Sequence, residues 1–76
     1  MEQVIKDEIF EYLDSVFPKI STKEELENTF TDKMNIWYST EDEEWKCLDI
    51  FHEYSNEMFS TDGKKIKSVG ERNYWK

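Results

Sequence analysis

The feature that most limits the fold of this chain is the absence of a covalent or metal crosslink in only 76 residues. Its single cysteine, Cys47, cannot form a disulfide within the chain, and its single histidine, His52, nearly excludes a Cys/His zinc site. A chain this short buries only roughly 60–65% of the surface that it exposes when unfolded. Five Phe, four Tyr and three Trp can compensate, because each buried ring removes about 150–250 Å² from water. We therefore predict one domain, residues 1–76, with an aromatic core.

The charge of the chain is divided unevenly along its length. Residues 1–59 carry sixteen Asp and Glu against five Lys, whereas residues 60–76 carry five Lys and Arg against two acids, and the net charge is −8. An acidic body of this kind disfavours direct binding to nucleic acid or to an anionic membrane. The many aromatic residues argue against a disordered chain.

The sequence also indicates a compartment. No apolar run approaches the ~18 residues of a membrane-spanning helix, and the first residues lack the basic and apolar regions of a secretory signal. An unpaired cysteine fits a reducing environment. We therefore expect a cytoplasmic protein, in the host cytoplasm if the protein is viral.

Residues 2–17 are predicted to form a long amphipathic helix, because apolar side chains recur at every fourth position. These side chains are Ile5, Ile9, Leu13 and Phe17. Pro18 lacks an N–H group and disfavours helical geometry in the residue before it, so the helix is expected to end at about Phe17.

A second, short helix is predicted to begin at Ser21-Thr22. Each of these hydroxyl residues has a glutamate three positions later, which is the capping-box pattern at a helix start. The helix is expected to end near Thr31 or Asp32. The next segment, Met34–Tyr38, is short, aromatic and flanked by polar residues, and it is predicted to be a strand.

Residues 40–59 allow two interpretations. A helix would begin at Ser39 or Thr40, place four acids in its first turn, and carry an apolar stripe at intervals of four, three and four. That stripe consists of Cys47, Phe51, Tyr54 and Met58. The alternative is a strand pair, with Trp45–Glu53 as one strand and a turn at Ser55-Asn56. The helix is favoured because the apolar residues do not alternate cleanly.

The end of the chain differs in kind. Thr61-Asp62-Gly63 is a turn signal, Lys64–Val69 alternates enough to be predicted as a strand that Gly70 breaks, and Asn73–Trp75 could form an edge strand or a docked end. We expect the basic end to fold back as a hairpin onto the acidic body.

These elements together predict an α+β fold. In it, the N-terminal amphipathic helix and a second helix pack on a short antiparallel sheet made of Met34–Tyr38 and Lys64–Val69. The alternative keeps one or two helices and turns residues 33–76 into a three- to four-stranded β-meander.

Catalytic and metal chemistry find little support in the sequence. Asp49 and His52 have the i, i+3 spacing of a metal-binding pair, but carboxylate-bridged di-iron sites need that pair twice. Cys47 lies among acids, which disfavour the reactive thiolate, and neither phosphate-binding glycine motif is present. We therefore expect a protein that is not an enzyme and has no cofactor and no metal.

The basic end could in principle hold single-stranded nucleic acid, because its lysines are mixed with Tyr74 and Trp75. The acidic body lies within one or two Debye lengths, so we favour a different role for these lysines. They are expected to offset the acids of the same molecule.

The acidic surface is the strongest candidate for a binding site. Two dense acidic clusters with two tryptophans nearby have the composition of an interface, in which an aromatic anchor is surrounded by steering charge. The predicted partner-binding residues are Glu24, Glu25, Glu27, Glu41, Asp42, Glu43, Glu44, Trp37 and Trp45. A solvated face that only keeps the protein soluble is the competing interpretation.

The function predicted from these features is inhibition or sequestration of a basic, nucleic-acid-handling protein, with carboxylates occupying positions that DNA phosphates would take. In size and charge the chain resembles, as a type, the small acidic inhibitors that phages make against host restriction, CRISPR or transcription machinery. One alternative is an immunity or antitoxin protein that neutralises a basic nuclease toxin. Another is a small structural subunit that forms homo-oligomers, such as a homodimer.

Overall fold

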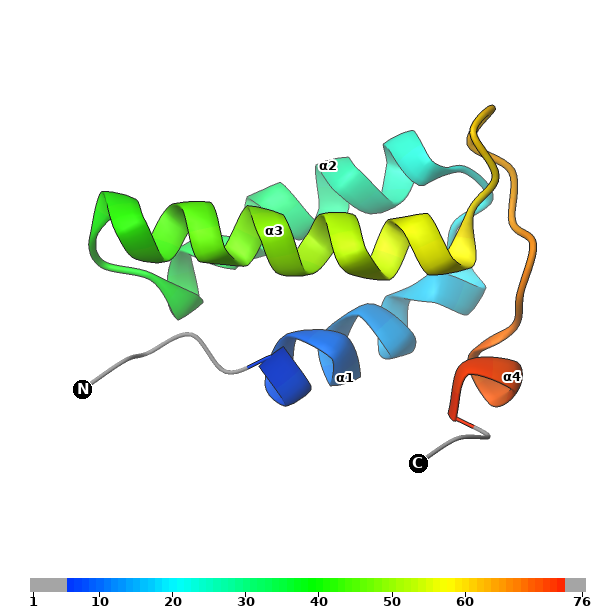
Figure 1. Ribbon diagram of the computed structural model, residues 1–76, viewed down its shortest axis with the longest axis horizontal. Coiled ribbons are helices and arrows are strands. Elements are labelled where there is room, and N and C mark those ends of the chain that lie inside the picture. The colour runs from blue at the N-terminus through cyan, green and yellow to red at the C-terminus, as the bar shows by residue number, and fades with distance from the viewer. Residues whose placement is uncertain (1–5, 74–76) are drawn as a thin grey trace.

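The computed structural model describes residues 6–73, with side chains described for residues 6–71, and these residues are mostly helical. Helices α1 (Lys6–Val16), α2 (Lys23–Lys33) and α3 (Glu41–Met58) pack side by side, and α2 and α3 run in opposite directions (Figure 1). The predicted α+β fold is wrong, and so is the alternative β-meander, because residues 6–73 contain no sheet.

Helix α1 confirms the apolar stripe of the N-terminal segment. Ile9 and Leu13 are fully buried, and the stripe continues into Phe17, which is 3% exposed in the short 3₁₀ helix η1 (Phe17–Lys19). Pro18 occupies the start of η1, where its missing N–H group leaves no intrahelical bond unmade. Residues 2–5 of the predicted helix lie outside the described residues.

Helix α2 begins with the capping box that the sequence predicts. The Thr22 hydroxyl accepts a hydrogen bond from the Glu25 backbone N–H, and the Glu25 carboxylate accepts one from the Thr22 backbone N–H. Leu26 and Phe30, one helical turn apart, are fully buried on its inner face. The predicted short helix is therefore confirmed, with its end at Lys33.

The predicted strand Met34–Tyr38 is wrong. Residues Met34–Trp37 form a second 3₁₀ helix, η2, which continues directly from α2. A 3₁₀ helix has three residues per turn, so Met34 and Trp37 share one side, and both are only 4% exposed. The Trp37 ring stacks on the Phe30 ring of α2, with the ring centroids 5.8 Å apart. The 3₁₀ turn brings the chain back over α2 and so makes this contact possible.

Residues 40–59 adopt the favoured helical structure. Thr40 is the N-cap of α3, and its hydroxyl accepts a hydrogen bond from the Glu43 backbone N–H at 3.2 Å. The predicted stripe of α3 faces the core, with each member 1% exposed or less. A helix satisfies the backbone of this acidic segment locally, whereas a strand pair would need partners that the fold does not supply.

We define residues 60–73 as the C-terminal segment. The strand predicted within it, Lys64–Val69, is not formed. Only two isolated bridges occur here, Thr22 with Lys64 and Phe59 with Lys65, and no ladder extends from them. Because Met34–Trp37 is helical, no strand is available to pair with Lys64–Val69. The turn at Thr61-Asp62-Gly63 is confirmed, and Gly63 has a φ of 85°.

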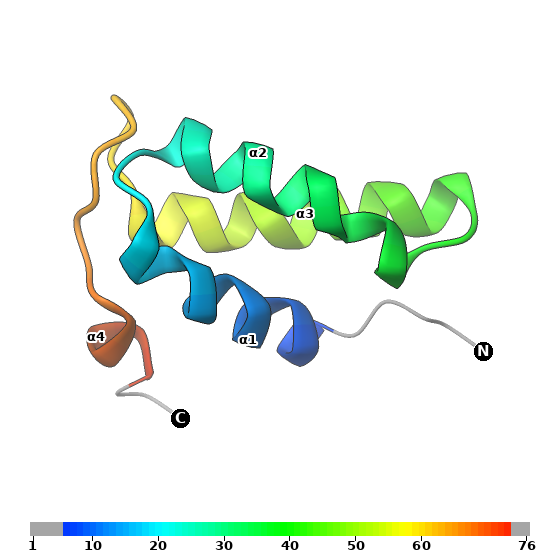
Figure 2. The ribbon, with the colours of Figure 1, turned by 180° about the vertical axis from the view of Figure 1, so that it is seen from behind.

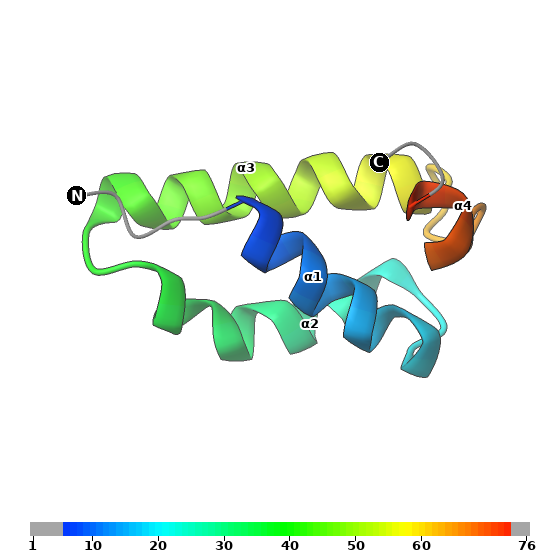
Figure 3. The same cartoon turned by 90° about the horizontal axis from the view of Figure 1, so that it is seen from below.

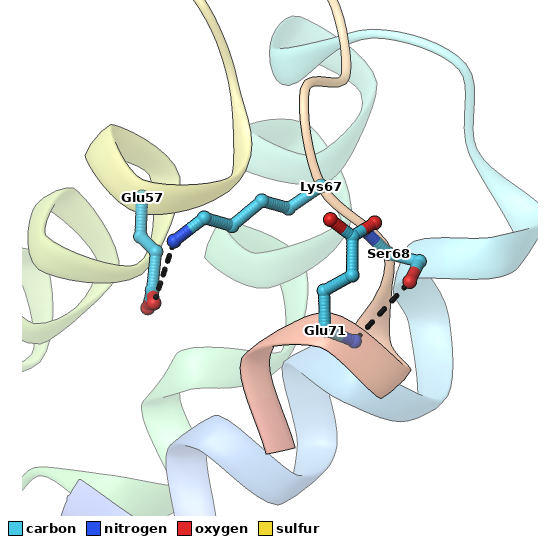
Figure 4. Close-up of polar contacts among 4 residues, drawn as sticks. All are labelled: Glu57, Lys67, Ser68 and Glu71. Atoms are coloured by element: carbon cyan, nitrogen blue, oxygen red, sulfur yellow. Dashed lines mark hydrogen bonds and ion pairs between the residues drawn. The ribbon is translucent and has the colours of Figure 1, made fainter. Parts of the chain in front are cut away.

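The last described residues form a short helix, α4 (Val69–Asn73), which includes the glycine that was expected to break a strand. Ser68 and Glu71 form a reciprocal capping pair at its start: Ser68 Oγ accepts from the Glu71 N–H, and Glu71 accepts from the Ser68 N–H (Figure 4). The predicted edge strand at Asn73–Trp75 is therefore wrong at Asn73, and Tyr74 and Trp75 lie outside the described residues.

The core lies where α1 crosses α2 and α3, an arrangement seen in Figure 3. The rings of Phe30 of α2 and Phe51 of α3 stack with their centroids 5.1 Å apart, and those of Tyr54 of α3 and Phe10 of α1 form a T-shaped pair with centroids 5.2 Å apart. Aromatic rings thus join all three helices. They supply the apolar contact area that crosslinks provide in many small domains.

Candidate functional site

The two acidic clusters lie at opposite ends of the molecule. Helix α3 begins at one end, whereas α2 begins at the end where α3 finishes (Figures 1 and 2). The bridges from the C-terminal segment to Thr22 and to Phe59 fix this arrangement. Glu24, Glu25 and Glu27 therefore do not join the cluster of residues 41–44 in one continuous face.

One acid in each cluster has a local structural role. The Glu25 carboxylate accepts hydrogen bonds from the backbone N–H groups of Ser21 and Thr22, at 2.9 and 3.1 Å. The Glu43 carboxylate accepts from the backbone N–H of Ser39 at 2.9 Å and from its hydroxyl at 3.1 Å. Both acids occupy the third position of their helix, and they stabilise helix starts as well as adding surface charge.

Trp37 belongs to the core. Besides stacking on Phe30, its ring lies 5.4 Å from that of Tyr12, and its buried indole N–H has no hydrogen-bond partner among the described residues. An indole that is only 4% exposed cannot act as a surface anchor in this structure. We therefore leave Trp37 out of the candidate site.

Trp45 has the opposite environment, with 61% of its surface exposed in the second turn of α3. On a helix, its neighbours along the surface are the residues three and four positions away. Glu41, Asp42 and Asp49 occupy three of these four positions, and all three are exposed. Leu48, at the fourth, is partly buried. We call Glu41, Asp42, Trp45 and Asp49 the Trp45 surface.

The three carboxylates of the Trp45 surface carry uncompensated charge. None of them forms an ion pair within the described part of the chain, whereas Glu53 pairs with Lys6 at 2.6 Å and Glu57 pairs with Lys67 at 3.3 Å. Ile36, 58% exposed in η2, adds apolar surface close to the start of α3, because η2 directly precedes α3 in the chain. The arrangement is an exposed aromatic ring bordered by acids.

The C-terminal segment is attached to the body at several points. Lys67 reaches across to Glu57 on α3 (Figure 4). The Lys65 ammonium donates a 2.7 Å hydrogen bond to the Phe17 carbonyl oxygen and lies 4.4 Å from the centre of the Phe17 ring. The backbone of the C-terminal segment is held by a 2.9 Å hydrogen bond from the Ile66 N–H to the Met58 carbonyl oxygen. These lysines contact the body of their own molecule.

Cys47 is fully buried, and its thiol lies 4.0 Å from the Trp37 carbonyl oxygen. Burial raises the pKa of Cys47, and the Glu43 and Glu44 carboxylates raise it further. Asp49 and His52 lie on the exposed side of α3. Within residues 6–71, no group of three or more His, Cys, Asp or Glu side chains is placed to hold a metal ion.

The chain was compared with known proteins at the level of sequence and of structure. No protein-family model matches it, and neither the curated proteins nor the solved structures gave a match. Among the described residues, no helix is both long enough and apolar enough to cross a membrane. The function must be inferred from the geometry of the chain itself.

Proposed function

We propose that this protein is a small, non-enzymatic inhibitor that binds a basic, nucleic-acid-handling protein through the Trp45 surface. The observation that carries the proposal is a tryptophan 61% exposed to solvent, surrounded by three carboxylates that form no ion pair with any described residue. Exposed apolar surface rimmed by polar residues is typical of interaction sites, and tryptophan is enriched among the residues that dominate binding energy.

The surrounding acids favour a partner of opposite charge. Proteins that handle nucleic acid line their grooves with Lys and Arg, which hold phosphates. Carboxylates on successive turns of α3 can occupy such a groove, and a net charge of −8 accelerates the encounter. An immunity protein that neutralises a basic nuclease would use the same chemistry. The buried, unpaired Cys47 agrees with a reducing compartment, so we propose that the protein acts in the cytoplasm.

The proposal can be tested by capture of partners on immobilised protein, with elution by salt. The wild type should retain a basic protein at about 50 mM salt and release it as salt approaches 1 M, because exposed charge pairs are screened. Trp45→Ala should weaken retention by about tenfold or more if the indole is the anchor. The captured protein should also lose its binding to nucleic acid when the wild type is added.

The chain offers a matched control for the acids. E41Q/D42N and E24Q/E27Q each remove two negative charges from the first five residues of a helix, and only the first pair lies on the Trp45 surface. The first variant should slow association, and the second should leave it nearly unchanged. If the two variants change the association rate equally, the acids have only a general solubility role. If Trp45→Ala retains as much of the partner as the wild type, the proposed surface is excluded.

A further inference from the structure

A second surface with complementary chemistry lies at the other end of the molecule. An open pocket of about 410 Å³ lies between η1 and the C-terminal segment. Phe17, Pro18 and Val69 supply apolar lining, and Lys65 and Lys67 supply positive charge. We call these five residues the Lys65 pocket. Its volume falls within the range of roughly 300–1,000 Å³ that is common for binding clefts.

Lys65 has no acidic partner among the described residues. It donates to a neutral carbonyl oxygen and lies over an aromatic ring, and no carboxylate of the described residues pairs with it. An ammonium group has three donors, and a single carbonyl bond leaves two for an incoming carboxylate. The nearby Lys67 is engaged at 3.3 Å by the half-buried Glu57.

The Trp45 surface offers what the Lys65 pocket lacks. It presents an apolar ring for the lining formed by Phe17, Pro18 and Val69, together with carboxylates for Lys65. We propose that the protein associates with itself head to tail, the Trp45 surface of one copy seating in the Lys65 pocket of the next. A second copy is the occupant that the structure supports because both complementary surfaces belong to this chain.

The positions of the two surfaces determine the kind of assembly. The start of α3 and the pair formed by η1 and α4 lie at opposite ends of the molecule (Figures 1 and 2). Two different surfaces at opposite ends make a heterologous contact, which extends into open chains instead of closing as a symmetric dimer. Each added copy covers one Trp45 ring and leaves another exposed at the end of the chain.

The association is expected to be weak. One ring in one pocket makes a small contact, and copies with a net charge of −8 repel each other over distance. At physiological salt the Debye length is about 8 Å, so distant repulsion is screened while contacting groups still attract. Self-association uses the surface of the proposed function, and it would compete with a basic partner.

The proposal can be tested by sedimentation velocity at physiological salt, at protein concentrations up to about 1 mM. The weight-average sedimentation coefficient of the wild type should rise with concentration. Trp45→Ala and Lys65→Glu should each weaken association by about tenfold or more, whereas Lys64→Glu should behave as the wild type. Lys64 is the matched control because it is the exposed neighbour of Lys65, takes the same change of charge, and does not line the pocket.

A mixture of the two defective variants gives the decisive measurement. Trp45→Ala keeps an intact Lys65 pocket, and Lys65→Glu keeps an intact Trp45 surface, so together they can form one contact. The mixture should therefore form dimers that do not grow further, at concentrations where each variant alone is mostly monomeric. Circular dichroism confirms that both variants fold.

Three outcomes would overturn the proposal: a wild type that stays monomeric up to about 1 mM, association that survives Lys65→Glu, or a mixture that stays monomeric. If self-association survives in Lys65→Glu but is lost in Trp45→Ala, the copies instead meet through a symmetric contact between two Trp45 surfaces. Lys65→Glu also separates this inference from the proposed function. It leaves the Trp45 surface intact, so it should still retain a basic partner even where self-association is lost.

Discussion

Two tryptophans eight positions apart in the chain have opposite environments. Trp37 is 4% exposed and Trp45 is 61% exposed, although both were predicted to belong to one binding site. The exposure of Trp45 could have been deduced, because the helical interpretation of residues 40–59 puts Cys47 and Phe51 on the opposite side from it. The same periodicity would have added Asp49 to the site. The burial of Trp37 could not have been deduced from the sequence, because this burial depends on the 3₁₀ turn that folds the Trp37 ring onto Phe30.

One buried hydroxyl is expected to contribute to stability. Tyr54 is fully buried, and its hydroxyl donates a 2.8 Å hydrogen bond to the Asp14 carboxylate, which joins α3 to α1. Tyr54→Phe should lower the free energy of unfolding by about 1.5–3 kcal/mol, the usual range for a hydrogen bond to a charged group. Urea denaturation measures the change.

A control for this variant is Tyr38→Phe. Tyr38 is partly buried, and no hydrogen bond from its hydroxyl is found among the described residues, so its removal should change the free energy of unfolding by less than about 0.5 kcal/mol. Equal losses in the two variants would mean that the bond between Tyr54 and Asp14 adds nothing beyond ring packing.

The buried thiol predicts a pH dependence. Burial and two nearby carboxylates raise the pKa of Cys47, so the folded protein holds this proton more tightly than the unfolded chain does. The resulting stabilisation is complete below the ordinary thiol pKa and is lost as the pH rises toward the raised value. Cys47→Ala should therefore flatten the decline in unfolding free energy between about pH 8 and pH 10. A decline of the same slope in the variant would exclude Cys47 as its cause.

At the scale of the elements, the starts of α2 and α3 were predicted correctly from the sequence, whereas the strands were predicted wrongly. Thr22 with Glu25, and Thr40 with Glu43, satisfy backbone N–H groups within a few residues, so the sequence pattern contains the whole interaction. A strand needs a partner strand elsewhere in the chain. We predicted that Met34–Tyr38 and Lys64–Val69 pair with each other as strands. Because Met34–Trp37 is helical instead, the C-terminal segment forms only isolated bridges.

The two glycines provide a matched pair of substitutions in the C-terminal segment. Gly63 has a φ of 85°, and its N–H donates to Ser60 in the turn, so Gly63→Ala should cost about 1 kcal/mol or more. Gly70 lies in α4 with no atom nearer than 3.8 Å to an added methyl group, so Gly70→Ala should be neutral or slightly stabilising. Thermal unfolding compares the two variants, and an equal loss in both would contradict the role of the turn.

On the scale of the whole molecule, folding redistributes the charge that the sequence divides into an acidic body and a basic end. The C-terminal segment returns to the start of α2 and the end of α3, where Lys65 and Lys67 contact the body. The start of α3, at the far end, keeps the uncompensated carboxylates of the Trp45 surface. The molecule therefore has an acidic end and an end of mixed charge.

This distribution predicts that salt stabilises the protein. Raising NaCl from about 10 mM to about 150 mM shortens the Debye length from about 30 Å to about 8 Å and screens the repulsion among the excess acids. The pairs Lys6–Glu53 and Lys67–Glu57 are partly exposed and contribute little for salt to remove. The urea midpoint should therefore rise with NaCl. A midpoint that falls instead would mean that specific ion pairs outweigh the net repulsion.

The sequence by itself determined the helix starts, the apolar stripes of α1 and α3, the aromatic core and the excess of acid. Each of these depends on residues within one or two helical turns, or on composition alone. Only the tertiary structure decided that Met34–Trp37 coils, that the two acidic clusters lie apart, and that Lys65 meets Phe17. Those outcomes depend on contacts between distant segments, whose free energies are set by the packing of the whole chain and not by any local pattern.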